Sequence, residues 1–231
     1  MIFRSREELD YVREKLRPTL EKRFSTRASS CCAGATPAGA LLLQVAGYQP
    51  GRLRKLKLFA WAGDSAQADI MKALGYQPVV LEVADILPGL QTGMIAALPS
   101  SPFWALTLQF YTQADHMLDM NWAPLVGAVV ITRKSWDSLS PAGQKALREA
   151  GEAAGVQLRT ISRRENEEAV AAMKRRGLKV HSVTPEAEAE WRRTAEQLYL
   201  MIRGTLGAGG PAFDEVQRLL REQRAAVAVR R

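Results

Sequence analysis

Strand and helix patterns alternate along residues 55–112, with short connections between them. Lys55–Trp61 alternates two kinds of side chain, as a strand with two different faces does. Helical spacing follows at residues 66–74, a strand pattern at 78–81, a helix at 85–91, a strand at 94–97 and a helix at 102–112. Such alternation predicts an α/β fold with a mainly parallel sheet.

A long helical pattern dominates the second half of the chain. Residues 127–132 form a continuous apolar run, typical of a strand that is buried on both faces. Ser140-Pro141 then opens a helix whose apolar spacing lasts until Gly177. A helix of about 35 residues is near 50 Å long, so we expect it to lie across two lobes and tie them together. Thr184-Pro185 and Gly210-Pro211 open two further helices.

The first 54 residues are less regular. Residues 6–22 carry apolar side chains three or four apart, which predicts a helix that Pro18 would bend or split. Residues 24–50 lose both periodicities and are rich in Ala, Gly and Ser. We expect this stretch to lack a buried strand, to make few contacts and to be cut first by proteases. The predicted domains are a remnant first lobe with this insert (1–54), a second α/β lobe (55–125), and a crossover strand with the long and C-terminal helices (126–231).

The net charge of +8 raises the question of nucleic-acid binding. Residues 58–127 hold one Lys against six Asp or Glu, so the positive excess lies in the flanking segments. There the basic residues alternate with acidic ones on helices, which indicates a solvated surface. We expect no nucleic-acid partner, and a basic helical interaction or nucleic-acid-binding protein remains the alternative.

Residues that carry catalysis or bind metals form no recognisable pattern in the chain. Cys31 and Cys32 are adjacent, which suits no tetrahedral metal site, and His116 and His181 stand alone in the sequence. No nucleophile has a base at a recognisable spacing, and no Gly-rich phosphate loop follows a strand. We therefore expect no metal, no cofactor and no enzymatic activity, with an α/β enzyme as the second alternative. No run of eighteen apolar residues is present, and the N-terminus carries no export signal.

The block of residues 56–102 resembles the DctP-type solute-binding proteins of tripartite ATP-independent periplasmic (TRAP) transporters. The matching runs are LKLFAWAG and GYQPVVLEVADILPGLQTGMIAALPSSP, followed by VITRKSWDSLSPAGQKAL and RRGLKVHSVTPEAEAEW. The resemblance extends over residues 55–205. It implies a periplasmic-binding-protein-like fold of two lobes, with the first lobe incomplete here. It also implies a periplasmic receptor that closes on a small organic acid or related apolar solute and delivers it to the membrane subunits of a TRAP transporter.

Two departures from the family pattern affect the expected site. Phe59 stands where the family has an arginine that resembles a clamp for a ligand carboxylate, and Ala96-Ala97 stands where the family has a D-G pair. Because these departures remove charged groups, we expect a rather apolar site. Ligands of open α/β sheets bind at the carboxyl ends of strands, so we expect the site there. The residues expected to bind the solute are Phe59, Trp61, Ser100, Ser101, Trp104, Asn121 and Trp122. Helix capping by the serines, core packing by Trp61 and Trp104, and a hinge at Asn121-Trp122 are the alternatives.

Family members are longer than this chain and begin with an export signal and most of a first lobe. The irregular stretch at residues 24–50 stands where relatives have a strand and loop. We therefore hypothesise a reading-frame error in an Arg- and Ala-rich coding region, which would make the chain a fragment or gene remnant.

Overall fold

The computed structural model describes residues 3–24, 28–44, 50–205 and 210–229. Within these ranges, side chains are described for all residues except 23–24, 28–40, 50, 121–128, 197–198, 200–205 and 229. The chain forms two compact units, and segments of one unit alternate with segments of the other along the sequence. The first is built mainly from Ala38–Ala123 and Arg164–Gly207, and the second from Phe3–Pro37, Pro124–Arg163 and Ala208–Arg231.

The strands form a mixed six-stranded sheet with the order β3-β2-β4-β1-β5-β6. Their bounds are β1 (Ala28–Leu43), β2 (Lys57–Trp61), β3 (Gln77–Leu81), β4 (Ala97–Ser100), β5 (His116–Thr132) and β6 (Lys179–Ser182). β2 pairs in parallel with both β3 and β4, as expected, and β5 pairs in parallel with β6. The pairing of β1 with β4 is antiparallel.

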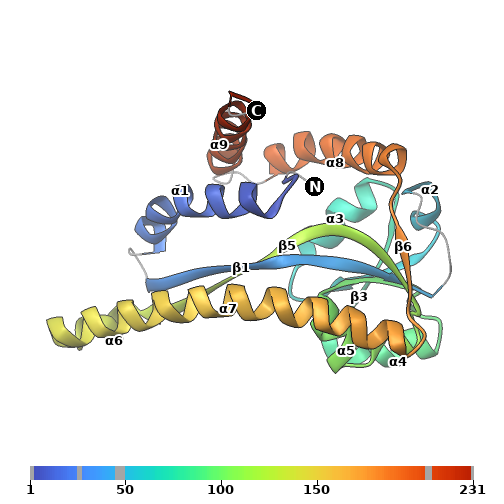
Figure 1. Cartoon of the computed structure of the whole chain (residues 1–231), viewed down its shortest axis with the longest axis horizontal. Coiled ribbons are helices and arrows are strands. Elements are labelled where there is room, and N and C mark those ends of the chain that lie inside the picture. The colour runs from blue at the N-terminus through green and yellow to red at the C-terminus, as the bar shows by residue number, and fades with distance from the viewer. Residues whose placement is uncertain (1–2, 25–27, 45–49, 206–209, 230–231) are drawn as a thin grey trace. The chain divides into compact units, whose positions relative to one another are not determined.

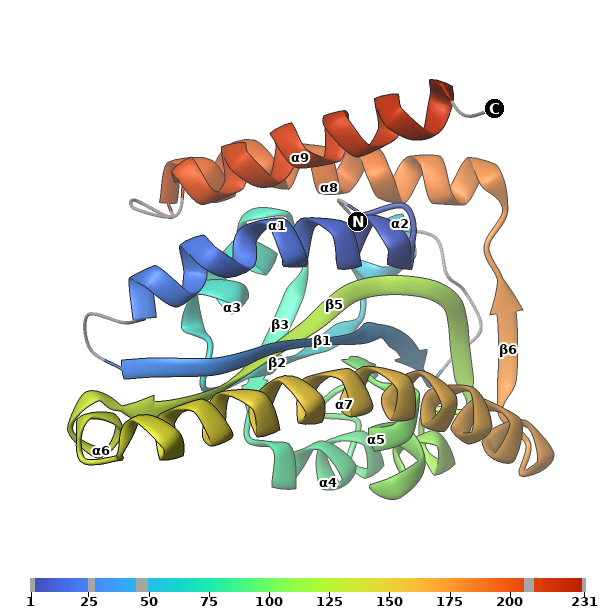
Figure 2. The same cartoon turned by 60° about the vertical axis from the view of Figure 1, so that its left-hand side comes forward.

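Helices cover both faces of the sheet in the first unit (Figure 2). α3 (Ser65–Ala73) lies on one face, with α2 (Pro50–Leu53) and α8 (Pro185–Thr205) on the same side. α4 (Ile86–Gln91), α5 (Pro102–Thr107) and the C-terminal part of α7 (Pro141–Arg175) lie on the other. Two short 3-10 helices, η1 (Val83–Asp85) and η2 (Phe110–Thr112), complete the unit.

Two hydrophobic cores fill the layers on either side of this sheet. Leu58 and Ala60 of β2 pack with Trp191 of α8 in one core, whereas Phe59 packs with Met173 of α7 in the other. Because successive side chains of a strand point to opposite faces, β2 contributes to both cores. The predicted strand with two different faces is confirmed, and at its centre Leu58, Phe59 and Ala60 are all buried, so both faces are covered there.

The second unit contains α1 (Arg6–Phe24), α6 (Arg133–Asp137), the first part of α7 and α9 (Gly210–Val229). α1 and α9 pack against each other (Figure 1). Glu8 of α1 is buried and accepts two hydrogen bonds from Arg224 of α9, from Nε at 2.7 Å and from Nη2 at 2.9 Å. α1 runs unbroken through Pro18, so of the two predicted effects of Pro18, a bend or a split, the split is wrong. No helix among the described residues has the length and apolar character needed to cross a membrane.

The predicted long helix is confirmed, since α7 covers Pro141–Arg175. The predicted helix 102–112 is instead two pieces, because Gln109 has a φ of 58°, a left-handed conformation that ends an α-helix. The third strand begins three residues later than expected, at Ala97. Gly93, with a φ of 69°, ends α4 and leaves residues 94–96 as a connection.

The stretch at residues 24–50 contains a strand, contrary to expectation. β1 covers Ala28–Leu43, and Leu41, Leu42 and Leu43 are almost fully buried. Leu42 pairs with Leu98 of β4, and its neighbours Leu41 and Leu43 pack into the opposite core. Three consecutive leucines suit a strand that is covered on both faces, so neither helical nor alternating periodicity marks it. Residues 25–27 and 45–49 and the side chains of Cys31 and Cys32 lie outside the described residues, and early proteolysis stays a prediction.

Candidate functional site

The carboxyl ends of β2 and β4 meet at one edge of the sheet in the first unit. The two strands are parallel and neighbouring, with Leu58 beside Ala97. Three residues further along each strand come Trp61 and Ser100, the last residues of β2 and β4. In open α/β sheets ligands bind at this edge. The parallel register places two of the predicted site residues, Trp61 and Ser100, there.

Trp61 is held at this edge by the turn that follows β2. Its carbonyl accepts a hydrogen bond from the backbone N–H of Asp64 at 3.0 Å, and the Asp64 carboxylate caps α3 by accepting from the N–H of Gln67 at 3.0 Å. The indole lies against Gly63, where an added Cβ would come within 2.4 Å of the ring. The side chain is 48% exposed, which excludes the alternative of core packing.

Ser101 begins α5 as its N-cap. Its hydroxyl accepts a hydrogen bond from the backbone N–H of Trp104 at 3.2 Å, and the residue is buried. Ser100 is half-buried, and its hydroxyl donates to the Ser101 carbonyl at 3.2 Å. The capping alternative is therefore confirmed for Ser101, while a ligand contact by either serine stays a prediction.

Phe103 and Trp104 extend from the first turn of α5 with much of their surface exposed. Trp104 is 51% exposed, so core packing does not account for it. The two rings meet edge to face, with centroids 6.2 Å apart. The backbone N–H of Phe103 donates to Oδ1 of Asn166 on α7 at 2.9 Å, which anchors the start of α5 to the long helix. Trp61, Phe103 and Trp104 together are called the aromatic edge below.

The other predicted site residues have different surroundings. Phe59 is only 8% exposed and packs in the core with Leu42, Leu98 and Ile86. Asn121 and Trp122 lie within β5 rather than before it, and their side chains are outside the described ones. A solute contact by these three residues stays a prediction.

His116 and His181 do not stand alone, contrary to the sequence-based expectation. Nδ1 of His116 lies 2.6 Å from Nε2 of His181, and the rings stack. Only the parallel register of β5 with β6 brings them together, and no sequence pattern reveals that register. Among the described residues, no group of three or more His, Cys, Asp or Glu side chains is arranged to hold a metal ion.

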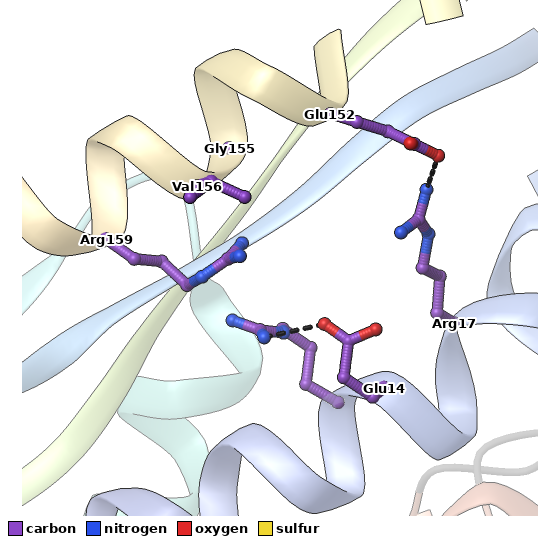
Figure 3. Close-up of a pocket in the computed structure, with 7 residues that line it drawn as sticks. Glu14, Arg17, Glu152, Gly155, Val156 and Arg159 are labelled. Atoms are coloured by element: carbon purple, nitrogen blue, oxygen red, sulfur yellow. Dashed lines mark hydrogen bonds and ion pairs between the residues drawn. The ribbon is translucent and has the colours of Figure 1, made fainter. Parts of the chain in front are cut away.

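The second unit contains a polar pocket between α1 and the first part of α7, with a volume of about 170 Å³ (Figure 3). It is lined by Arg13, Glu14, Arg17, Glu152, Gly155, Val156 and Arg159. The Arg17 guanidinium is paired with Glu152 across the pocket and with Glu21 on its own helix. No sequence pattern indicated this pocket, because the two helices are more than a hundred residues apart in the chain.

Comparison with known proteins identifies the kind of protein that this chain resembles. It is 27% identical over 139 residues to the C4-dicarboxylate-binding periplasmic protein DctP of Rhodobacter capsulatus, covering 60% of this chain and 42% of that protein. It is 30% identical over 104 residues to a solute-binding protein of Sulfitobacter, covering 45% of this chain and 32% of that protein. The chain thus matches less than half the length of these curated relatives.

Solved structures share the fold. DctP7, a Bordetella pertussis extracytoplasmic solute receptor binding pyroglutamic acid, has a TM-score of 0.82 at 18% identity, over 93% of this chain and 71% of that one. A TRAP periplasmic solute-binding protein of Ralstonia eutropha H16 with bound (S)-2-acetolactate has a TM-score of 0.86 at 16% identity, over 96% of this chain and 72% of that one. The expected periplasmic-binding-protein-like α/β fold is therefore confirmed.

The DctP family model matches residues 48–203 and includes every residue of the aromatic edge. Because this match covers more than half of the 231 residues, the chain belongs to the family of bacterial extracellular solute-binding proteins, family 7.

Proposed function

We propose that this protein is the solute receptor of a TRAP-type transporter and that the aromatic edge forms part of its solute-binding site. One observation carries the proposal: the family match covers the segment that forms the carboxyl ends of β2 and β4 and the start of α5. Two exposed tryptophans at such an edge supply a wall that suits an apolar surface of a ligand. The match supports neither the nucleic-acid-binding nor the enzyme alternative.

The proposed solute is a small organic acid with an apolar part. Receptors of similar fold bind pyroglutamic acid, (S)-2-acetolactate and D-glucuronate, which are all small organic acids. Phe59 cannot donate to a carboxylate and is buried, so the carboxylate would be held by other groups. The exposed indoles of Trp61 and Trp104 would contact the remainder of the solute.

The wider receptor function follows from the same proposal. In a receptor of two lobes, the lobes close around the solute about a hinge, and the closed form is recognised by the membrane subunits. The protein would act outside the cytoplasm, as the family description implies, and would perform no chemistry on its solute.

Calorimetry tests the proposal. The protein is titrated with mono- and dicarboxylates, amino acids and neutral apolar compounds. Trp61→Ala and Trp104→Ala should each weaken the binding of the best ligand by roughly 1 to 3 kcal/mol, the usual cost of removing an aromatic wall. Met94→Ala is the matched control, because Met94 is as exposed as Trp61 but precedes β4 at its other end. Unchanged affinity in both tryptophan variants would remove the aromatic edge from the site.

A further inference from the structure

The polar pocket of the second unit combines side chains from single faces of two helices. Arg13 and Arg17 are four residues apart on α1, and Glu152, Val156 and Arg159 recur at intervals of four and three on α7. Gly155 is buried and contributes no side chain, which leaves room between the helices. In Figure 3 the Arg159 side chain extends from α7 toward α1, and it faces the side of α1 that carries Glu14 and Arg17.

The charges of this pocket are unequally paired. Arg17 has two carboxylate partners, Glu21 and Glu152. Arg13 donates from Nη2 to Glu14 at 2.7 Å, whereas its buried Nη1 makes no hydrogen bond, although Asp10 Oδ1 is 3.3 Å away. Arg159 has no hydrogen bond or ion pair with any residue that the structure describes. The pocket therefore has one guanidinium, Arg159, with no described carboxylate in hydrogen-bond or ion-pair contact, and one, Arg13, with an unused donor.

The electrostatic surroundings of Arg159 work against its positive charge. Burial lowers the pKa of the Arg159 guanidinium below its ordinary value, the neighbouring Arg13 and Arg163 lower it further, and Glu14 and Asp10 oppose them. The protein retains the charge, since an arginine is not deprotonated at any ordinary pH. A bound anion would relieve both the repulsion and the loss of hydration.

The shape and lining of the pocket define the class of anion. Guanidinium groups bind planar carboxylates and tetrahedral oxyanions through two parallel hydrogen bonds. Val156 adds an apolar wall beside Arg159, and the volume of about 170 Å³ accommodates a short carbon chain in addition to one charged group. An apolar side chain makes no favourable contact with a phosphate, whereas it packs against the alkyl part of an organic acid.

We propose that the pocket between α1 and α7 binds a small monocarboxylate, with its carboxylate held between Arg159 and Arg13 and its alkyl chain against Val156. This site shares no residue with the aromatic edge, and it does not depend on the proposed receptor function.

The test uses the full chain, with acetate, butyrate and phosphate as probes at constant ionic strength. Butyrate should raise the melting temperature and bind more tightly than acetate, and phosphate should bind more weakly than butyrate. Arg159→Gln should weaken butyrate binding at least ten-fold. Lys145→Gln is the control, because it also removes one positive charge from α7 in the same unit, but from a side chain that is 77% exposed. The butyrate affinity of this variant should match that of the unmodified protein.

A second measurement separates loss of the site from loss of the fold. Without any added anion, Arg159→Gln should melt at the same temperature as the unmodified protein or above it, because the substitution removes an unpaired charge. Absence of butyrate binding, retention of full affinity by Arg159→Gln, or an equal loss in Lys145→Gln would overturn the proposal. Tighter binding of phosphate than of butyrate would overturn the assignment to a monocarboxylate.

Discussion

Nδ1 of His116 lies 2.6 Å from Nε2 of His181, and the two rings stack with centroids 4.9 Å apart. In this contact one ring nitrogen must donate and the other accept. Asp115 and Lys179 flank the pair and bond to each other at 2.9 Å. The pairing joins β5 to β6 through side chains as well as through the backbone.

His116 should make stability fall as the pH falls below 6.5. Burial lowers the pKa of His116, Lys179 and His181 lower it further, and Asp115 opposes them. The unfolded chain therefore binds the proton first, so the stabilisation is complete above pH 6.5 and is lost as the pH falls toward the folded-state pKa. Melting temperatures measured between about pH 7.5 and 5.5 should fall. His116→Gln should flatten this slope, and an unchanged slope would contradict the assignment.

The Glu8 and Arg224 pair should be a major contributor to the stability of the second unit. Burial raises the pKa of Glu8, but hydrogen bonds from Arg224 and from the Arg4 backbone N–H outweigh it and lower the pKa overall. Arg224→Leu strands a buried carboxylate and should cost about 3 kcal/mol in denaturant unfolding. Arg218→Leu, on the same helix with a side chain that is 55% exposed, should change little. Equal losses of unfolding free energy in the two variants would show that the buried pair contributes no more to stability than an exposed one.

The same pair predicts a second dependence on acid. Because the folded-state pKa of Glu8 is lowered, its contribution is complete above the ordinary value of 4.5 and is lost as the pH falls through the folded-state pKa. Unfolding measured below pH 4.5 should show a shallower acid dependence in Glu8→Gln than in the unmodified protein. An identical dependence in both proteins would mean that Glu8 titrates as if it were free.

Gly63 should control the position of the Trp61 indole. A Cβ at residue 63 would lie within 2.4 Å of the ring, so Gly63→Ala must displace it. Because Trp61 is largely exposed, the ring can move at little cost in stability, and its fluorescence should shift toward that of a solvated indole. Gly51→Ala is the control, since a Cβ there meets nothing within 4 Å. If Trp61 contacts the solute, only Gly63→Ala should also weaken binding.

Leu42 should be an integral part of the core. It is fully buried in the core that also contains Leu98 and Met173, so Leu42→Ala should cost roughly 3 to 5 kcal/mol by leaving a cavity. Leu158→Ala, at a leucine of α7 that is 52% exposed, removes the same atoms and should cost far less. Equal unfolding midpoints for the two variants would indicate that the burial of Leu42 in β1 contributes little to stability.

The sequence by itself determined the elements whose signals are local. The Ser140-Pro141 start and the apolar spacing up to Gly177 identified α7, because a cap and a helical period depend only on near neighbours. The carboxyl edge of β2 and β4 was also predictable, since strand and helix alternation implies parallel pairing. The motifs at residues 56–102 indicated the family, because each of them is a short run of neighbouring residues in the chain.

Only the tertiary structure decided which distant residues meet. The burial of Leu41, Leu42 and Leu43 depends on β4 and on the helices that cover both faces, and a run of leucines without a period does not specify them. Likewise, the pairing of His116 with His181 requires the β5–β6 register, and the pocket around Arg159 requires the packing of α1 against α7. Register and helix packing are set by the combined burial of many side chains far apart in the chain, so no local pattern of residues encodes them.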